Sequence, residues 1–413
     1  MLKIVYQICC GLDVHKDFVY ACIATTNERG VTTYKSNRFS TYSRGLRKLT
    51  AWLGENNCSD VCMESTGKYW IPVYNMLETT CNVVLVHPKY VKSIRGKKTD
   101  KKDAKWIADI FKHDLVCGSF IPPPEIRQLR DLIRYHIKLT SYTTGEKNRA
   151  QNCLTVSNLK LDDVFSDVFG KSATALINQI LEHPNEPFDV SPFVHKGCKT
   201  PIDDIQAAVD GAICSEQAEK LRIIRGHMND LDKAKDNLMS AILTVAEKFI
   251  PQINLVSSVP GIASFSAIAI IGEIGVDMSV FPTAKHLCSW AGLTPQNNES
   301  AGKKKTTRIS RAGVYIKPLL VQCANAAIKG DNHPEIKNRY LKLKKRRGHK
   351  KAIIAIARML LTAIFNILKK NESYNPLLYS KPDAPISNSS IPLDLAIRVI
   401  QSQGYSVVSP SGS

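Results

Sequence analysis

The sequence lacks an apolar run long enough to cross a bilayer. Its longest apolar run, IIAIARMLLTAIFNIL at 353–368, contains Arg358 and is shorter than the roughly 20 residues that a membrane-spanning helix needs. We interpret it as a core helix and expect no membrane partner. The start of the chain also lacks the basic segment, long apolar stretch and small-residue cleavage site of a secretory leader. We therefore expect the protein to act in the cytoplasm.

The sequence also lacks two Cys/His pairs at the spacing of a structural zinc site. Its 12 cysteines are scattered singly in apolar runs, as Cys9 and Cys288 illustrate, where thiols usually behave as small buried hydrophobes. Cys58 and Cys62 come closest to a ligand pair, but no second pair accompanies them. We expect reduced thiols and no structural zinc.

Negative charge is scarce relative to positive charge. The 413 residues include 56 lysines and arginines against 37 aspartates and glutamates, a formal net charge of +19. Such an excess favours a polyanionic partner, with nucleic acid ahead of an anionic membrane surface. The length allows two or three domains.

The first part of the chain, 1–124, predicts a mixed α/β domain. Three consecutive segments have strand character and are separated by HKD and NERG, which are typical of hairpin turns. Helical and strand patterns then alternate, and a last helix begins after Thr99, a plausible N-cap. The expected order is strands at 4–14, 18–26 and 31–39, helix 43–56, strand 60–65, helix 68–80, strand 82–88 and helix 99–114.

The remaining chain predicts mostly helices. Basic residues recur along a helix at 125–157, and apolar residues recur at nearly heptad spacing over 215–249, which favours a coiled-coil arm or a dimer helix. No elements are assigned between 158 and 212. We expect a basic-helix and dimerisation region at 125–250, a helical domain at 251–370 and a loosely ordered tail at 371–413.

Four carboxylates have positions that suggest a shared site. Asp13 lies just inside the end of the first strand, Glu64 ends the fourth, and Asp100 and Asp103 open the helix after Thr99. With the first strand central and the fourth beside it, all four converge at one edge of the sheet. Clustered carboxylates require a cation, and hard oxygen ligands favour Mg²⁺ or Mn²⁺. Taken singly, each residue also suits a turn, a helix cap or a solvated first helical turn.

The sequence resembles a known family, the DEDD transposases of insertion sequences, which are related to the Piv DNA invertases. The resemblance covers about residues 8 to 370 and is carried by GLDVHKD, MESTGKYW, VHPKYVKSIRGKKTDKKDAKWIA, LVSSVPGIASFSAIAIIGEIG, FPTAKHLCSWAGLTPQNNESAGKKKTTRISRAG and LKLKKRRGHKKAIIAIARMLL. It implies an RNase H-like (RuvC-like) amino-terminal domain with Asp13, Glu64, Asp100 and Asp103 as catalytic metal ligands. It also implies a carboxy-terminal transposase domain with a serine that attacks DNA.

The resemblance assigns the nucleophile to Ser300, which would form a covalent phosphoserine link. The family's Ser-Gly is here Ser300-Ala301, followed by Gly302. From the residues alone, a serine in this polar loop is an ordinary turn residue, and Ser310 is the competing candidate. We expect the nearby cations to hold the scissile phosphate. They are Lys303, Lys304, Lys305 and Arg308.

Two further basic segments predict nucleic-acid contact, although a charge run is often only a solvated face. One segment precedes and opens the Asp100 helix. The other precedes the apolar 353–368 run, and the mutual repulsion of its cations is easier to tolerate beside a phosphate backbone. The residues are Lys97, Lys98, Lys101, Lys102, Lys344, Lys345, Arg346 and Arg347. The family resemblance further implies double-stranded donor and target DNA, a guide (bridge) RNA and a homo-oligomer, a dimer or tetramer, with composite active sites.

The sequence thus predicts an insertion-sequence transposase that joins DNA through a phosphoserine intermediate with Mg²⁺, associated with the nucleoid. Three alternatives remain open. A Piv-type site-specific invertase would use the same residues on inverted sites. A metal-dependent junction nuclease would use water as the nucleophile, and a non-catalytic nucleic-acid-binding scaffold would not need the four carboxylates.

Overall fold

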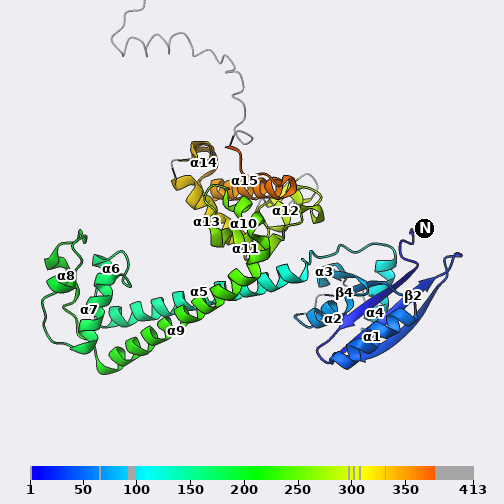
Figure 1. Cartoon of the computed structure of the whole chain (residues 1–413), viewed down its shortest axis with the longest axis horizontal. Coiled ribbons are helices and arrows are strands. Elements are labelled where there is room, and N and C mark those ends of the chain that lie inside the picture. Colours follow the sequence, from blue (N-terminus) through cyan, green and yellow to red (C-terminus); the bar gives the residue numbers. More distant parts are fainter. Residues whose placement is uncertain are drawn as a thin grey trace, which may run out of the picture. The chain divides into compact units, whose positions relative to one another are not determined.

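The computed structural model describes residues 2–64, 67–91, 99–295, 298–300, 303–306, 308–330 and 332–376, with backbone only at 89, 90, 298–300 and 303–306. The chain divides into two compact units, Met1–Pro122 and Pro123–Ser413, here called the amino-terminal and carboxy-terminal units (Figure 1). The predicted tail lies outside the described residues from 377 onward.

The amino-terminal unit is built on a mixed sheet (Figure 1). The sheet has five strands in the order β3-β2-β1-β4-β5. The central strand β1 (Ile8–Val14) pairs antiparallel with β2 (Phe18–Thr26), which pairs antiparallel with β3 (Thr32–Ser40). On its other side β1 pairs parallel with β4 (Asp60–Glu64), which pairs parallel with β5 (Asn82–Val86). The predicted strand order, with the first strand central and the fourth beside it, is confirmed.

Helices cover both faces of this sheet because side chains alternate along each strand. On one face, Leu12 and its neighbours pack against apolar residues of α1 (Ser43–Glu55) and α2 (Trp70–Leu77). On the other, Cys9, Cys62 and Val86 pack against α4 (Asp100–Lys112) and the short α3 (Pro88–Val91). The result is an α/β/α arrangement, and α4 lies over the central strands.

Gly11 explains how α4 can lie directly on β1. A Cβ at Gly11 would stand 2.2 Å from the carbonyl oxygen of Ala104 and 2.4 Å from the amide nitrogen of Ala108. No side chain fits there, so glycine lets the helix backbone touch the strand. This close approach brings the first turn of α4 to the end of β1.

The last turn of α4 is held on the sheet by a polar group. The buried Lys112 donates from Nζ to Asp109 Oδ1 at 2.8 Å and to the Tyr34 hydroxyl at 3.3 Å. The Tyr34 hydroxyl also donates to Asp109. Because a buried charge is tolerated only when it is paired, this group fixes the position of α4 against β3.

Two long helices, α5 (Pro124–Val156) and α9 (Ser215–Ala246), pack along each other in the carboxy-terminal unit (Figure 1). Both helices were predicted. The heptad-like residues of α9, such as Leu221 and Ile224, are buried with Cys153 and Leu154 of α5, so the coiled-coil partner of α9 is α5 of the same chain. The unassigned region between them forms α6 (Leu161–Val164), α7 (Lys171–Glu182), the 3-10 turn η1 (Ser191–Phe193) and α8 (Ile202–Ala208).

The rest of the carboxy-terminal unit is a helical bundle with one short hairpin. Its elements are η2 (Glu247–Phe249), α10 (Ile250–Ser257), α11 (Ser264–Ile274), η3 (Met278–Val280), α12 (Ala284–Trp290), β6 (Asn298–Ser300), β7 (Lys303–Thr306), α13 (Ile316–Lys329), α14 (Pro334–Arg347) and α15 (His349–Lys370). By length and composition α15 is apolar enough to cross a membrane. Its apolar side chains, however, are buried against α10, α12, α13 and α14, as the sequence predicts for a core helix.

Part of the basic face predicted for α5 has a structural role. Arg130 donates from Nε to the Gly272 carbonyl at 3.0 Å and from a terminal nitrogen to the Glu273 carbonyl at 2.6 Å. Arg134 binds both carboxylate oxygens of the buried Glu273, at 2.7 and 2.9 Å. Arg130 thus satisfies two carbonyls at the end of α11, where intrahelical donors run out, and Arg134 pairs the buried carboxylate beside them.

Candidate metal centre

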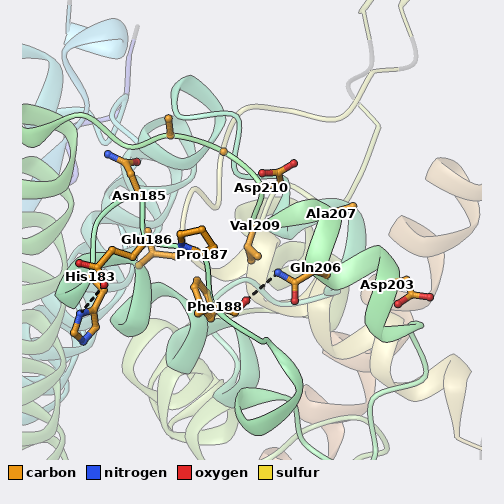
Figure 2. Close-up of a pocket in the computed structure, with 13 residues that line it drawn as sticks. His183, Asn185, Glu186, Pro187, Phe188, Asp203, Gln206, Ala207, Val209 and Asp210 are labelled. Atoms are coloured by element: carbon orange, nitrogen blue, oxygen red, sulfur yellow. Dashed lines mark hydrogen bonds and ion pairs between the residues drawn. The ribbon is translucent and has the colours of Figure 1, made fainter.

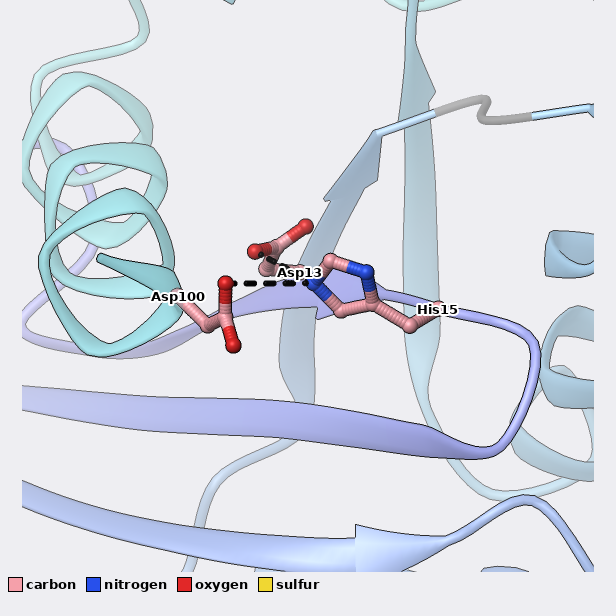
Figure 3. A group of neighbouring side chains, drawn as sticks. All are labelled: Asp13, His15 and Asp100. Atoms are coloured by element: carbon pink, nitrogen blue, oxygen red, sulfur yellow. Dashed lines mark hydrogen bonds and ion pairs between the residues drawn. The ribbon is translucent and has the colours of Figure 1, made fainter. Parts of the chain in front are cut away.

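Asp13, near the end of β1, and Asp100, in the first turn of α4, both face His15 (Figure 3). The His15 Nε2 atom is 3.1 Å from Asp13 Oδ2 and 3.5 Å from Asp100 Oδ1. One ligand atom from each of the three residues lies within 4.8 Å of the other two. The Asp13 side chain is 13% exposed and that of Asp100 is 48% exposed. Solvent therefore reaches the group from the side of α4.

The electrostatics of Asp13 favour a cation at this place. Burial raises the pKa of the Asp13 carboxyl, His15 lowers it through its charge and hydrogen bond, and the charges of Asp100 and Asp103 raise it. A buried carboxylate that faces two others is stabilised by any positive charge placed between them. Either a proton or a metal ion meets that need.

Asp103 and Glu64 belong to the same neighbourhood but not to this group of three. Asp103 is half-buried, one helical turn after Asp100, and its charge acts on Asp13. Glu64 is half-buried at the end of β4. The parallel register pairs Leu12 with Met63, so the next residues, Asp13 and Glu64, stand level on adjacent strands and on the same face of the sheet.

His15 was not among the residues proposed from the sequence, where HKD was interpreted only as a turn. The signal was present, because His15 follows Asp13 by two residues and a strand places such residues on one face. The turn begins only after this position: the His15 amide donates to the Phe18 carbonyl at 2.9 Å. Its ring therefore stays beside the carboxylates.

The side chains fit a divalent cation. Asp13 and Asp100 offer carboxylate oxygens, which suit Mg²⁺ and Mn²⁺, and His15 offers an imidazole nitrogen, which suits many transition metals. Among the described residues this is the one group of histidine, cysteine and acidic side chains that is close enough to share an ion. Cys58 and Cys62 are poorer candidates for metal ligands. Burial raises the pKa of each thiol to about 12, which disfavours the thiolate that binds a metal.

Ser300 ends β6, which forms an antiparallel hairpin with β7 in the carboxy-terminal unit. The backbone of Ser300 pairs with that of Lys303, and Glu299 pairs with Lys304. The side chains of Ser300, Lys303, Lys304 and Lys305, and the whole of Ala301 and Gly302, lie outside the described residues.

The base of this hairpin is held by a backbone bridge and by a lysine side chain. Pro295 pairs with Ile309, and Lys317 donates from Nζ to the Ser310 carbonyl at 2.7 Å and to the Ala312 carbonyl at 2.8 Å. The competing serine has a local role, since the Ser310 hydroxyl accepts from the Ala312 amide at 3.3 Å. Such a turn is what a serine in a polar loop ordinarily makes.

The predicted basic residues occupy three places. Lys101 and Lys102 are exposed in the first turn of α4, and Arg308 is exposed after β7. Exposed cations also fill the last turn of α14, namely Lys344, Lys345, Arg346 and Arg347. Gly348 then turns the chain at a φ of 78°, which favours glycine. Lys97 and Lys98 lie outside the described residues.

A cavity of about 520 Å³ in the α6–α8 region is a weaker candidate (Figure 2). Its polar groups bond within the chain: Asn185 exchanges two hydrogen bonds with the Ile213 backbone, and Gln206 Nε2 donates to the Phe188 carbonyl. These bonds serve the loop itself. We therefore regard the carboxylate group as the functional site.

Two models of transposase families match the chain. One, described as "Transposase" and covering the DEDD transposases of the IS110 group, matches residues 10–158. The other, described as "Transposase IS116/IS110/IS902 family", matches residues 253–341. The first match contains Asp13, Glu64, Asp100 and Asp103, and the second contains Ser300.

Curated relatives agree with these matches. The transposase for insertion sequence element IS1111A of Coxiella burnetii is 24% identical over 297 residues, 70% of this chain and 72% of the relative. The pilin gene-inverting protein of Moraxella lacunata is 22% identical over 382 residues, 89% of this chain and 98% of the relative. The insertion element IS110 uncharacterized 43.6 kDa protein of Streptomyces coelicolor is 26% identical over 308 residues, 67% of this chain and 72% of the relative.

Proposed function

Because the chain belongs to the IS110 family of transposases, enzymes that act on DNA, we propose that it cuts and rejoins double-stranded donor and target DNA of an insertion sequence through a covalent link at Ser300. The observation that carries the proposal is the Asp13, His15 and Asp100 group, which lies within the match to the DEDD transposase model. We further propose that the five-stranded amino-terminal unit is RNase H-like. Its strand order and the carboxylates on β1, β4 and α4 support this assignment.

The family generally depends on a divalent metal, and we propose Mg²⁺, or Mn²⁺, for this protein. Asp13, Glu64, Asp100 and Asp103 would hold it, with His15 as a further ligand or as a hydrogen-bond partner of Asp13 and Asp100. When bound, such an ion polarises the phosphate and lowers the pKa of a coordinated hydroxyl or water. The burial of Asp13 keeps one ligand fixed before DNA arrives.

In the proposed covalent step, the Ser300 Oγ forms a bond to the scissile phosphorus, and the bond from phosphorus to the bridging sugar oxygen breaks. The serine hydroxyl gives up its proton and the leaving sugar oxygen gains one. In the second step a sugar hydroxyl of the other DNA attacks the phosphoserine, and the Ser300 oxygen takes back a proton. Cations stabilise the charged transition state, a role we propose for Lys303, Lys304, Lys305 and Arg308.

Nucleic-acid contacts beyond the reacting phosphate are proposed for Lys97, Lys98, Lys101, Lys102, Lys344, Lys345, Arg346 and Arg347. The exposure of Lys344 to Arg347, followed by exposed Lys350 and Lys351, supports this for the end of α14. We also propose a guide (bridge) RNA, a dimer or tetramer, and action on nucleoid DNA in the cytoplasm. The net charge of +19 is compatible with a structured RNA as well as DNA.

A second candidate function is site-specific DNA inversion. The pilin gene-inverting protein of Moraxella lacunata matches 89% of this chain and 98% of its own length. Inversion would use the same carboxylates and serine, and only the arrangement of the DNA sites differs. A metal-dependent junction nuclease, with water in place of Ser300, is the enzymatic alternative.

A denaturing gel tests the proposal. Full-length protein is incubated with labelled donor and target DNA, RNA from the element and Mg²⁺, and wild type is compared with Ser300→Ala, Ser310→Ala and Asp13→Asn. We expect a covalent protein–DNA adduct for wild type and Ser310→Ala alone. Free-ended cleavage that survives Ser300→Ala would identify a hydrolytic nuclease. A second substrate with two inverted sites on one DNA separates inversion from transposition.

A further inference from the structure

The sheet face that carries Asp13 continues beyond α4 onto β2 and β3. The strand register pairs Asp13 with Tyr20 and Tyr20 with Arg38. Paired residues on neighbouring strands share a face, so these three side chains form a row across the sheet. Phe18, two residues from Tyr20, lies on the same face.

A chain of contacts connects Arg38 to the candidate metal centre. The Arg38 guanidinium carbon lies 3.9 Å from the centroid of the Phe18 ring. The Phe18 ring in turn stacks on the His15 ring, with 4.5 Å between centroids and 29° between planes. His15 then bonds Asp13 at 3.1 Å. The guanidinium is thus held on an aromatic surface whose other neighbour is a residue of the site.

Two lysines of α4, Lys101 and Lys105, lie beside this row of side chains. Lys105 Nζ lies 3.9 Å from the centroid of the Tyr34 ring, on the face that carries Arg38. Burial raises the pKa of the Cys22 thiol beneath, while the charges of Lys105 and Lys101 act in the opposite direction. Lys101 is exposed one helical turn before Lys105 on α4, so the two lysines share a side of the helix.

Arg38 is available to a ligand. It is exposed, and in the part of the chain that the structure describes no carboxylate pairs with its guanidinium. A guanidinium that stacks on an aromatic ring does so through the face of its plane, and its N–H donors lie along the edge. A planar guanidinium with a free edge binds a phosphate through two parallel hydrogen bonds.

We propose that Phe18, Tyr20, Tyr34, Arg38, Lys101 and Lys105 form a binding strip for the backbone of the DNA strand that enters the metal centre. Arg38 contacts a phosphate next to the scissile one, and the lysines contact phosphates along α4. The proposal rests on the proposed function. Charge complementarity and continuity with the carboxylate group select a DNA strand as the occupant: three cations and three aromatic rings lead to a site that needs a phosphodiester.

The test measures binding separately from chemistry. Affinity of full-length protein for labelled donor and target DNA, and separately for labelled RNA from the element, is determined by anisotropy over a range of salt concentrations. The proteins compared are wild type, Arg38→Gln, Arg38→Lys and Arg47→Gln. Arg47 is an exposed arginine of α1, on the opposite face of the sheet, and serves as the matched control. Melting curves confirm that each variant is folded.

We expect Arg38→Gln to weaken DNA binding about tenfold, the effect of one lost charge-assisted phosphate contact. The slope of log affinity against log salt concentration should become shallower by about the amount that one phosphate contact contributes. Arg38→Lys should restore the slope, since it keeps the charge, but only part of the affinity. Arg47→Gln should match wild type in both quantities.

Unchanged affinity and slope for Arg38→Gln would overturn the inference. So would a loss that appears with the element's RNA but not with DNA, because the strip would then be an RNA surface. Neither result affects the proposed function, which depends on whether Asp13→Asn abolishes the adduct. If the adduct survives Asp13→Asn, the metal centre is wrong, whereas the salt slope still decides whether the strip binds DNA.

Discussion

Gly11 of β1 lies so close to Ala104 of α4 that a Cβ on Gly11 would stand 2.2 Å from the Ala104 carbonyl oxygen. The same contact sets how far Asp100, one helical turn earlier, stands from Asp13. The glycine of GLDVHKD is therefore part of the geometry of the candidate metal centre, although it carries no functional group.

Gly11→Ala should push α4 away from β1. Because the clashing atoms belong to the helix backbone, we expect destabilisation of about 1–3 kcal/mol or more, as for other overpacked cores. Metal binding should weaken as well, since Asp13 and Asp100 separate. Thermal melting and Mn²⁺ titration measure the two effects.

The matched control is Gly54→Ala in α1, where an added Cβ meets nothing within 4 Å. There the replacement should raise stability by about 0.5–1 kcal/mol, because alanine favours a helix over glycine. Equal melting temperatures for both variants would contradict the role assigned to Gly11.

Asp13→Asn should leave the protein folded and remove its metal-dependent chemistry. Burial already raises the pKa of Asp13, and Asp100 and Asp103 oppose its charge, so a neutral side chain is tolerated there. We expect adduct formation to fall at least about a hundredfold, as it should for wild type in EDTA. Asp17→Asn, a change in the exposed turn of the same hairpin, should be harmless. Loss of folding in Asp13→Asn would argue that the carboxylate is structural.

The Arg134 and Glu273 pair should contribute to stability because Arg134 pairs a buried carboxylate. Replacing both residues by apolar ones should cost much less than removing Arg134 alone. Arg134→Leu leaves the carboxylate of Glu273, whose side chain is 6% exposed, without its bidentate partner. We expect a loss of about 3 kcal/mol, the lower end for broken buried pairs, because Arg134 itself is partly exposed. The double variant Arg134→Leu/Glu273→Leu should recover much of the loss. Denaturant titration of the four proteins gives the coupling, and simple additivity would refute the pairing.

Leu231→Lys should destabilise the folded chain because Leu231, 7% exposed, is buried within it. An unpaired charge at a buried position is a strongly destabilising change. Ile223→Lys is the matched control on α9, since Ile223 is 65% exposed, and its stability should stay within about 0.5 kcal/mol of wild type. Light scattering on both variants then tests the proposed oligomer: a lower mass for Ile223→Lys at unchanged stability would locate a subunit interface on the outer face of α9.

Local sequence determined a large part of this protein. Alternating apolar residues and turn signals fixed the β1–β2–β3 meander, and Thr99, whose side chain accepts from the Lys102 amide, fixed the start of α4. These features were predictable because strand alternation, helix periodicity and capping depend on neighbours in the chain. The same patterns placed Asp13, Glu64, Asp100 and Asp103 at the ends of elements that meet.

Only the tertiary structure decided which side chains touch. It put His15 between Asp13 and Asp100. It directed Arg130 and Arg134, from the basic face of α5, toward the end of α11, and it made α5 the partner of α9. It also stacked Arg38 on Phe18, 20 positions earlier in the sequence. Periodicity defines the apolar face of an element but not what covers it, because that choice depends on the close packing of residues far apart in the chain.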